Sequence, residues 1–280
     1  MTSRYLPPDL ESWKGRPSPD KAYLHENIRP LNISAGAIPK QVSPAPVLLG
    51  YACDEGVVRN LGRPGAKSGP KALRGALGKM PLLREGTVLW DAGDLACTDG
   101  KLETFQQEFS QAIHQLIRKG YFPMAIGGGH DIAYAHFLGL CKARRRETSI
   151  GILNFDAHLD LRTPLPQPHS GSPFLQIAQF CRQEGRGFSY ACVGARRDAN
   201  PQELWDRAAS LGVMVVERKE MEGPKIDRVL DRIRQFMAPL DAVYLTVDLD
   251  GFSSAYAPGV SAASPMGFSP EILIPCMEMI

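Results

Sequence analysis

The chain has 280 residues, of which 44% are hydrophobic and 22% charged, and its formal net charge is +2. This balance is typical of a globular domain large enough to bury a core, and it gives no reason to expect a nucleic-acid partner. The sequence contains no apolar run of 18 residues and no signal-peptide pattern at its start, so we expect no membrane partner and a cytoplasmic location. Six scattered cysteines without a CxxC pair argue against a zinc ribbon or a disulfide scaffold.

The predicted elements alternate between strands and helices along most of the chain. Residues 1–45 are rich in proline and polar residues and predict an extended arm, with a short helix near 19–27. After the arm, short apolar runs predict strands at 46–51, 87–90, 122–126, 150–153, 188–194, 213–216 and 242–247. Helices are predicted between and after these strands, at 71–77, 102–120, 132–142, 174–184, 202–211, 225–236 and from about 269. The pattern predicts an α/β fold with a mostly parallel sheet, and a single catalytic domain at 46–280.

Acidic and imidazole side chains follow three of the predicted strands. Asp156, His158 and Asp160 alternate with apolar residues after the fourth strand, and residues two apart project to one side of an extended segment. Three further residues of these types lie at the ends of two other strands, His130 after the third and Asp248 and Asp250 after the seventh. Singly, each could be a helix cap or a hydrogen-bonded turn residue. Together, they predict one site at the carboxyl edge of the sheet.

Four aspartates in one place require compensating charge. Like charges within a few ångströms raise one another's pKa, and two divalent cations supply +4 against −4. A donor set of carboxylates with a minority of imidazoles and no thiolate suits Mn²⁺ or Mg²⁺ better than structural zinc. Two such ions make a hydrolytic centre, in which a bridging water is held as hydroxide at neutral pH. The residues therefore favour a dinuclear metallohydrolase over a structural cluster.

Three sequence blocks resemble the ureohydrolase family of arginases, agmatinases and formimidoylglutamases. They are Gly127–Asp131 (GGGHD), Asn154–Asp160 (NFDAHLD) and Asp248–Asp250 (DLD). The resemblance implies a three-layer α/β/α sandwich of the arginase type and two Mn²⁺ ions per subunit. It implies that His130 and Asp160 ligate one ion and His158 and Asp250 the other, with Asp156 and Asp248 bridging. A metal-bridging hydroxide, hydrogen-bonded by Asp160 as a catalytic residue, would then attack a planar C=N carbon.

Within that family, the chain looks most like the formimidoylglutamases, which hydrolyse N-formimidoyl-L-glutamate to L-glutamate and formamide in histidine breakdown. The segments that carry this resemblance are 13–16, 158–162 and 170–174. The partner would be a small amidine or guanidino substrate with carboxylates, and arginine pairs with carboxylate in a bidentate way. The candidate substrate-binding residues lie on loops at the carboxyl edge: Arg162, Ser170, Arg196, Arg197 and Asn200.

The proton shuttle has two candidates. Arginases and agmatinases carry a histidine before a glycine in the loop that follows the metal strand. Ser170 stands in that position here, with His169 one residue earlier, so His169 is a catalytic candidate whose role is left open between the two.

Two other readings of the chain remain. One is a ureohydrolase of the agmatinase, arginase or guanidinobutyrase type that releases urea, and the other is an inactive relative that serves as a binding subunit. The sequence ends inside a predicted helix, so the further strand and helix of the family are expected to be absent. A homo-oligomer is expected only by analogy with the family.

Overall fold

A computed structural model describes residues 4–34, 38–84, 86–223 and 226–280. The chain divides into two compact units, residues 1–144 and 145–280, and each is described by itself. Within the described residues, no helix is both long and apolar enough to cross a bilayer. The sequence-based division into an arm at 1–45 and a catalytic domain at 46–280 stays a prediction.

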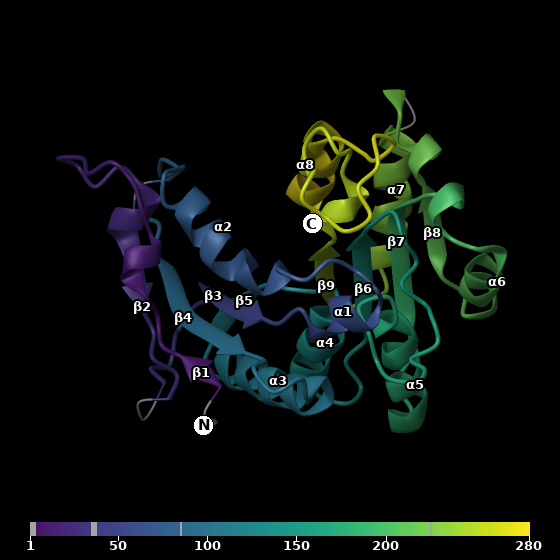
Figure 1. Cartoon of the computed structure of the whole chain (residues 1–280), viewed down its shortest axis with the longest axis horizontal. Helices are drawn as coiled ribbons and strands as arrows, with labels where there is room; N and C mark the ends of the chain where they lie inside the picture. Colours follow the sequence, from purple (N-terminus) through teal and green to yellow (C-terminus); the bar gives the residue numbers. More distant parts are fainter. Residues whose placement is uncertain (1–3, 35–37, 85, 224–225) are drawn as a thin grey trace. The chain divides into compact units, whose positions relative to one another are not determined.

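The first unit is built on a five-stranded sheet (Figure 1). Its centre is β3 (Ala45–Ala52), which pairs in parallel with β4 (Leu89–Ala96) and with β5 (Tyr121–Ile126). The predicted arm adds two short strands to β4, because β1 (Tyr5–Leu6) pairs with it antiparallel and β2 (Ile28–Pro30) in parallel. The arm also holds 3-10 turns at Leu10–Ser12 and Leu24–Asn27, the second lying within the predicted short helix. The arm is therefore part of the sheet rather than an unpaired extension.

Strand β4 continues six residues beyond the predicted end at Trp90. Two aspartates, Asp91 and Asp94, made that stretch look like a polar turn, yet Asp91 is fully buried inside the strand. The guanidinium of Arg74 makes this possible, since its Nε and Nη2 donate to the two oxygens of Asp91 at 2.8 Å each and its Nη1 donates to Asp94 at 2.6 Å. Trp13 Nε1 donates to Asp91 as well, at 2.8 Å. A bidentate partner lets a carboxylate be buried within a strand.

Helices cover both faces of this sheet. Alternate residues of β3 face opposite sides, so Val47, Leu49 and Tyr51 share a core with α3 (Leu102–Arg118), whereas Leu48 packs with Trp13 and with α2 (Gly69–Leu77). Helix α4 (Ile132–Ala143) packs against α3, and Figure 1 shows α2 and α3 on opposite sides of the sheet. A short helix that the sequence did not predict, α1 (Glu55–Arg59), follows β3.

The second unit has a four-stranded, fully parallel sheet in the order β8-β7-β6-β9. Its strands are β6 (Ile150–Phe155), β7 (Ser189–Ala195), β8 (Met214–Glu217) and β9 (Ala242–Val247). Strand β6 is buried along its whole length, as its apolar sequence predicts. Phe155 aligns with Val247 in the register, so the residues after β6 and β9 emerge side by side at one edge.

The helices of this unit form a layer on each side of its sheet. Ala191 and Val193 of β7 share a core with α7 (Ile226–Met237) and α8 (Pro270–Met279). Tyr190, which faces the other way, stacks on Phe174 of α5 (Pro173–Glu184) with ring centroids 4.4 Å apart. Helix α6 (Gln202–Ser210) precedes β8. Lys225, where the sequence predicted α7 to begin, lies outside the described residues.

Candidate metal centre

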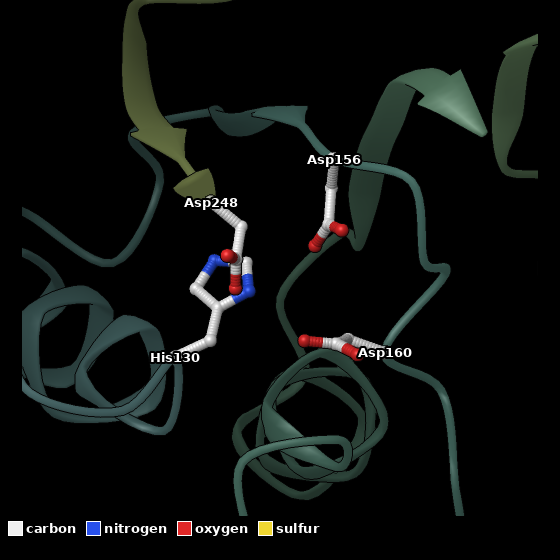
Figure 2. Close-up of side chains that lie close together, drawn as sticks. All are labelled: His130, Asp156, Asp160 and Asp248. Atoms are coloured by element: carbon white, nitrogen blue, oxygen red, sulfur yellow. The ribbon is translucent and has the colours of Figure 1, made fainter. Parts of the chain in front are cut away.

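Two carboxylate turns meet at the carboxyl edge of the second unit's sheet. Adjacent strands bring them together, since Asp156 N–H donates to the carbonyl of Val193 at 3.0 Å and Asp248 N–H to that of Phe155 at 2.9 Å. Asp156, Asp160 and Asp248 each offer an oxygen, and these oxygens lie within 4.8 Å of one another. Figure 2 shows the three carboxylates turned towards a common point. Asp156 also belongs to a second group with His158 and Asp250, again with ligand atoms within 4.8 Å.

Tight turns, rather than an extended strand, aim these side chains. The i, i+2 spacing predicts side chains that alternate along a strand, but β6 ends at Phe155 and β9 at Val247, before these residues. The Oδ1 of Asp156 accepts from His158 N–H at 2.7 Å, and the Oδ1 of Asp248 accepts from Asp250 N–H at 3.0 Å. Aspartate forms this local turn readily, because its side chain reaches the backbone two residues on. The same spacing therefore converges for a different local reason.

The pKa values of His158 and Asp250 are both raised, which shows that the crowded carboxylates favour positive charge or bound protons at this site. Burial disfavours the imidazolium of His158, yet hydrogen bonds with Asp156 and Asp250 outweigh it and raise the pKa of His158 to about 11. Burial, followed by the charges of Asp248 and Asp156, raises the pKa of Asp250 to about 8. His158 Nδ1 lies 3.2 Å from the Asp250 carboxylate. A bound metal ion would take over this charge compensation, and a set of carboxylates with an imidazole and no thiolate suits a hard divalent cation.

His130 lies in the first unit, between β5 and α4, and is 8% exposed. The glycines before it let the chain run against β3: Gly129 N–H donates to the carbonyl of Cys53 at 3.1 Å, and a Cβ on Gly128 would meet that oxygen at 2.0 Å. Asp131, fully buried, accepts a 2.5 Å hydrogen bond from the hydroxyl of Tyr51. Desolvation raises the pKa of Asp131 to about 6. The residues on both sides of His130 are thus tightly held.

The candidate substrate arginines differ in what they contact. Arg197 donates to Glu217 at 2.9 Å and its guanidinium lies 3.7 Å from the ring centroid of Trp205. Arg196 makes a two-point contact with Asp198, at 3.1 and 2.7 Å. The side chain of Arg162 is exposed, while its N–H donates to the carbonyl of Gly171 at 2.9 Å. Arg162 and Arg197 are both exposed, but the guanidinium of Arg197 is engaged by Glu217 and Trp205, so Arg162 is the better candidate for a substrate contact.

The loop after Arg162 places His169 and Ser170 differently. His169 is 8% exposed, its Nδ1 accepts from Gly171 N–H at 3.2 Å, and burial lowers its pKa by disfavouring the imidazolium. Ser170 is half-buried. Ser172 fixes this loop, since its hydroxyl accepts from His169 N–H at 3.0 Å and donates to Gln176 at 3.0 Å.

Sequence reasoning missed three residues that contact the metal-site turn and treated a fourth as a substrate contact. Asn154 stands in the NFDAHLD block but was given no role, and Tyr190 and Cys192 lie inside an apolar strand, where their polar atoms gave no signal of a role. The amide of Asn200, predicted to bind substrate, is 5% exposed and hydrogen-bonds to the backbone of Ala157 and Leu159. The register of β6 with β7 brings Asn154, Tyr190 and Cys192 to this turn, and the 3-10 turn after β7 brings Asn200 there.

Comparison with known proteins decides the family. A family model described as the Arginase family matches residues 45–280. This chain belongs to the arginase family. It is 41% identical over 273 residues to a formimidoylglutamase of Geobacillus thermodenitrificans, covering 96% of this chain and 83% of that protein. It is also 41% identical over 266 residues to a formimidoylglutamase of Chromobacterium violaceum, covering 95% and 84%.

Solved structures agree with the arginase-family assignment. Formiminoglutamase from Trypanosoma cruzi with Mn²⁺ is 25% identical with a TM-score of 0.72, covering 82% of this chain and 78% of that one. Formimidoylglutamase from Bacillus subtilis superposes with a TM-score of 0.80 over 94% of this chain and 81% of that one, and at 18% identity it shows the fold. The predicted three-layer α/β/α sandwich with a mostly parallel sheet is confirmed. The arginase-family fold and the clustered aspartates and histidine support a metal cofactor.

Proposed function

We propose that this arginase-family protein is a formimidoylglutamase, which hydrolyses N-formimidoyl-L-glutamate to L-glutamate and formamide in histidine breakdown. The observation that carries the proposal is the 41% identity to proteins of that name across about 95% of the chain. The acidic turns at Asp156 and Asp248 agree with it, because they supply the oxygen donors that a hydrolytic metal centre requires.

The cofactor we propose is a pair of Mn²⁺ ions. His130 and Asp160 would hold one, His158 and Asp250 the other, and Asp156 and Asp248 both. The grouping of Asp156 with two different sets of donors supports the shared role. When bound, the two ions would lower the pKa of a water molecule and polarise the amidine. His130 enters this set through the family resemblance and its place in the GGGHD block.

The protein's own residues would orient water and substrate. A carboxylate oxygen of Asp160 would accept a hydrogen bond from the attacking water and so direct its lone pair at the amidine carbon. Water oxygen adds to that carbon, the bond from the carbon to the glutamate nitrogen breaks, and this nitrogen takes up a proton as formamide forms. His169, a buried imidazole whose pKa is lowered by desolvation, is the candidate that we propose for moving that proton, with Ser170 as the neighbouring alternative.

The substrate carries two carboxylates, which arginine can recognise with paired hydrogen bonds. We propose Arg162 as the principal contact because its side chain is exposed on the loop that follows Asp160. Arg196 is the second candidate, since an incoming carboxylate could compete for it with the exposed Asp198. The contacts of Arg197 with Glu217 and Trp205, and those of Asn200 with the metal-site turn, favour supporting roles for these two residues. The cytoplasmic location and the homo-oligomer stay predictions.

A product assay tests this function. The purified protein is incubated with Mn²⁺ and with N-formimidoyl-L-glutamate, agmatine, arginine or guanidinobutyrate in parallel, and formamide, glutamate and urea are measured. We expect formamide and glutamate in equal amounts from the first substrate and little urea from the others, with Asp156→Ala as the inactive control. Urea from a guanidino substrate without formamide would instead identify an agmatinase, arginase or guanidinobutyrase. No product from any substrate, in protein that binds Mn²⁺, would support the inactive relative.

A further inference from the structure

The turn that carries Asp160 adopts a backbone conformation that an aspartate seldom takes. The φ angle of Asp160 is +47°, in the left-handed region that favours glycine. A non-glycine residue stays there only when surrounding contacts hold it. The contacts that hold this turn are therefore a means of controlling where the Asp160 carboxylate points.

Asn200 holds the turn on one side. Its Oδ1 accepts from Leu159 N–H at 2.9 Å, and its Nδ2 donates to the carbonyls of Ala157 and Arg196, each at 2.9 Å. These three bonds occupy both amide hydrogens and the amide oxygen in a setting that is 5% exposed. The Asn200 amide therefore links Ala157, the residue before His158, to Leu159, the residue after it.

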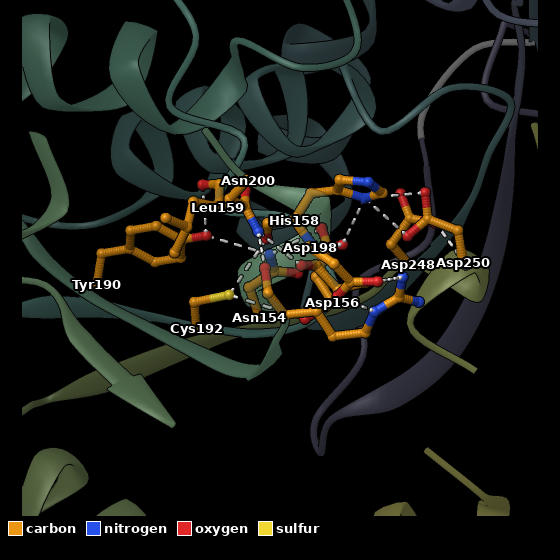
Figure 3. A network of polar contacts seen from close by, with 12 residues as sticks. Asn154, Asp156, His158, Leu159, Tyr190, Cys192, Asp198, Asn200, Asp248 and Asp250 are labelled. Atoms are coloured by element: carbon orange, nitrogen blue, oxygen red, sulfur yellow. Dashed lines mark hydrogen bonds and ion pairs between the residues drawn. The ribbon is translucent and has the colours of Figure 1, made fainter. Parts of the chain in front are cut away.

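Tyr190 holds the same turn from β7, as Figure 3 shows. Its hydroxyl donates to the carbonyl of Leu159 at 3.0 Å and accepts from Asn154 Nδ2 at 3.2 Å. Asn154 Nδ2 also donates to Oδ2 of Asp156 at 3.1 Å. The buried Tyr190 is thus linked to the backbone before Asp160 directly and to the carboxylate of Asp156 through Asn154.

The position of the Leu159 carbonyl oxygen depends directly on the φ angle of Asp160. It belongs to the peptide plane that precedes Asp160, and rotation about the N–Cα bond of Asp160 would swing this oxygen out of reach of Tyr190. On the other side, the Asp160 carbonyl accepts from Phe174 N–H at 3.3 Å. Asn200 fixes the N–H of Leu159 and Tyr190 fixes its C=O, so the φ angle of Asp160 has little freedom.

We infer that Asn200 and Tyr190 are positioning residues that hold Asp160 in its left-handed turn and thereby orient its carboxylate for metal binding and for the attacking water. The role in the reaction rests on the proposed function, whereas the role in the turn does not. Tyr190 has no assigned contact with the substrate, and the amide of Asn200, a substrate-binding candidate from sequence, is taken up by these backbone bonds. Their loss should loosen the turn without changing how the substrate is bound.

Tyr190→Phe is the cleanest test, because it removes one hydroxyl and keeps the ring that stacks on Phe174. Asn200→Ala removes the amide that holds the other side of the turn. Tyr121→Phe is the matched control, since it deletes a hydroxyl that accepts a hydrogen bond from Gln41 within the first unit. Outer contacts that orient metal ligands typically contribute 10- to 100-fold in affinity or activity. We therefore expect kcat to fall about tenfold in Tyr190→Phe, with KM changed less than about twofold.

Two readouts need no substrate. Hydrogen–deuterium exchange of metal-free protein should become about tenfold faster in the peptide covering residues 157–162 of both variants and stay unchanged in Tyr121→Phe. Mn²⁺ titration should show about tenfold weaker binding at one site. In the double variant, kcat should fall less than the product of the single effects, because both residues act on the peptide groups of Leu159.

The outcomes distinguish the positioning role of Asn200 and Tyr190 from the proposed hydrolase function. Unchanged exchange at 157–162 in Tyr190→Phe, or a rise in KM with kcat unaltered, would overturn the positioning role. If Asn200→Ala fails to fold, Tyr190→Phe still decides the question. A wild-type protein that does not hydrolyse formimidoylglutamate, but whose variants show faster exchange and weaker Mn²⁺ binding, would overturn the proposed function and leave the positioning role standing.

Discussion

Gly251 follows the acidic turn at Asp248–Asp250 and lies against the core, where we expect no side chain to be tolerated. A Cβ built there would lie 2.6 Å from Cζ of Phe268 and 3.1 Å from Cα of Asp156. Phe268 is fully buried and packs on Phe252 with ring centroids 4.8 Å apart, so its ring has little room to move. The backbone of Gly251 is not in the left-handed region, and the predicted penalty of Gly251→Ala is therefore steric.

Overpacking a closed core typically costs about 1–3 kcal/mol. For domains of roughly 150–250 residues, each 1 kcal/mol lowers Tm by about 2–4 °C, so Gly251→Ala should lower Tm by about 2–12 °C. To relieve the clash of the new Cβ, either Asp156 or the turn at Asp248 has to move. That turn is joined to Gly251 by a 3.2 Å hydrogen bond from Gly251 N–H to the carbonyl of Asp248. We therefore also expect Mn²⁺ affinity to fall about tenfold. Thermal unfolding of metal-free protein and a Mn²⁺ titration measure the two effects.

Gly259→Ala is the matched control, because a Cβ at Gly259 would meet nothing within 4 Å, and its effect should stay within about 0.5 kcal/mol. Trimming the ring in Gly251→Ala/Phe268→Leu should recover part of the lost Mn²⁺ affinity. Should Gly251→Ala match the control in both Tm and metal affinity, the packing of Phe268 does not support the position of Asp156, and the reasoning fails.

Three further predictions concern the charged residues. Asp156→Ala or Asp248→Ala should lower activity at least about a hundredfold and weaken Mn²⁺ binding, while circular dichroism shows the fold retained; full activity in either would remove that residue from the ligand set. Arg162→Ala should raise KM for formimidoylglutamate about tenfold or more but leave KM for an uncharged amidine unchanged, and an equal rise for both would show that the residue is misassigned. Because the pKa of Asp250 is raised to about 8, the stability of metal-free protein should fall as pH rises from about 4 to 8. Asp250→Asn should reduce that fall, most clearly below about pH 6.5, where the raised pKa of His158 does not contribute. At pH 8 it should add about 0.5–2 kcal/mol in denaturant unfolding, and no gain would contradict the crowding of carboxylates.

The alternating strands and the acidic blocks were readable from sequence because they depend on local pattern. The apolar run before Asp156 predicts a buried strand, and the similar run before Asp248 predicts another. The rule that parallel strands end at one edge is then enough to bring both aspartates together. The residue types alone predicted the kind of metal ion, because crowded carboxylates with an imidazole and no thiolate indicate hard divalent ions whichever turn presents them.

The tertiary structure alone decided which polar residues face the site and which serve the fold. Arg197 and Asn200 looked alike as loop candidates, but Arg197 lies over Trp205 and Asn200 bonds to Leu159, 41 residues earlier. Likewise, β4 runs through Asp91 because Arg74, 17 residues earlier, neutralises it. Such partners are set by strand register and helix packing, which place groups distant in sequence within hydrogen-bond reach. The sequence by itself therefore determined the kind of chemistry at the sheet edge, and the packing of the chain decided how the Asp160 turn is held.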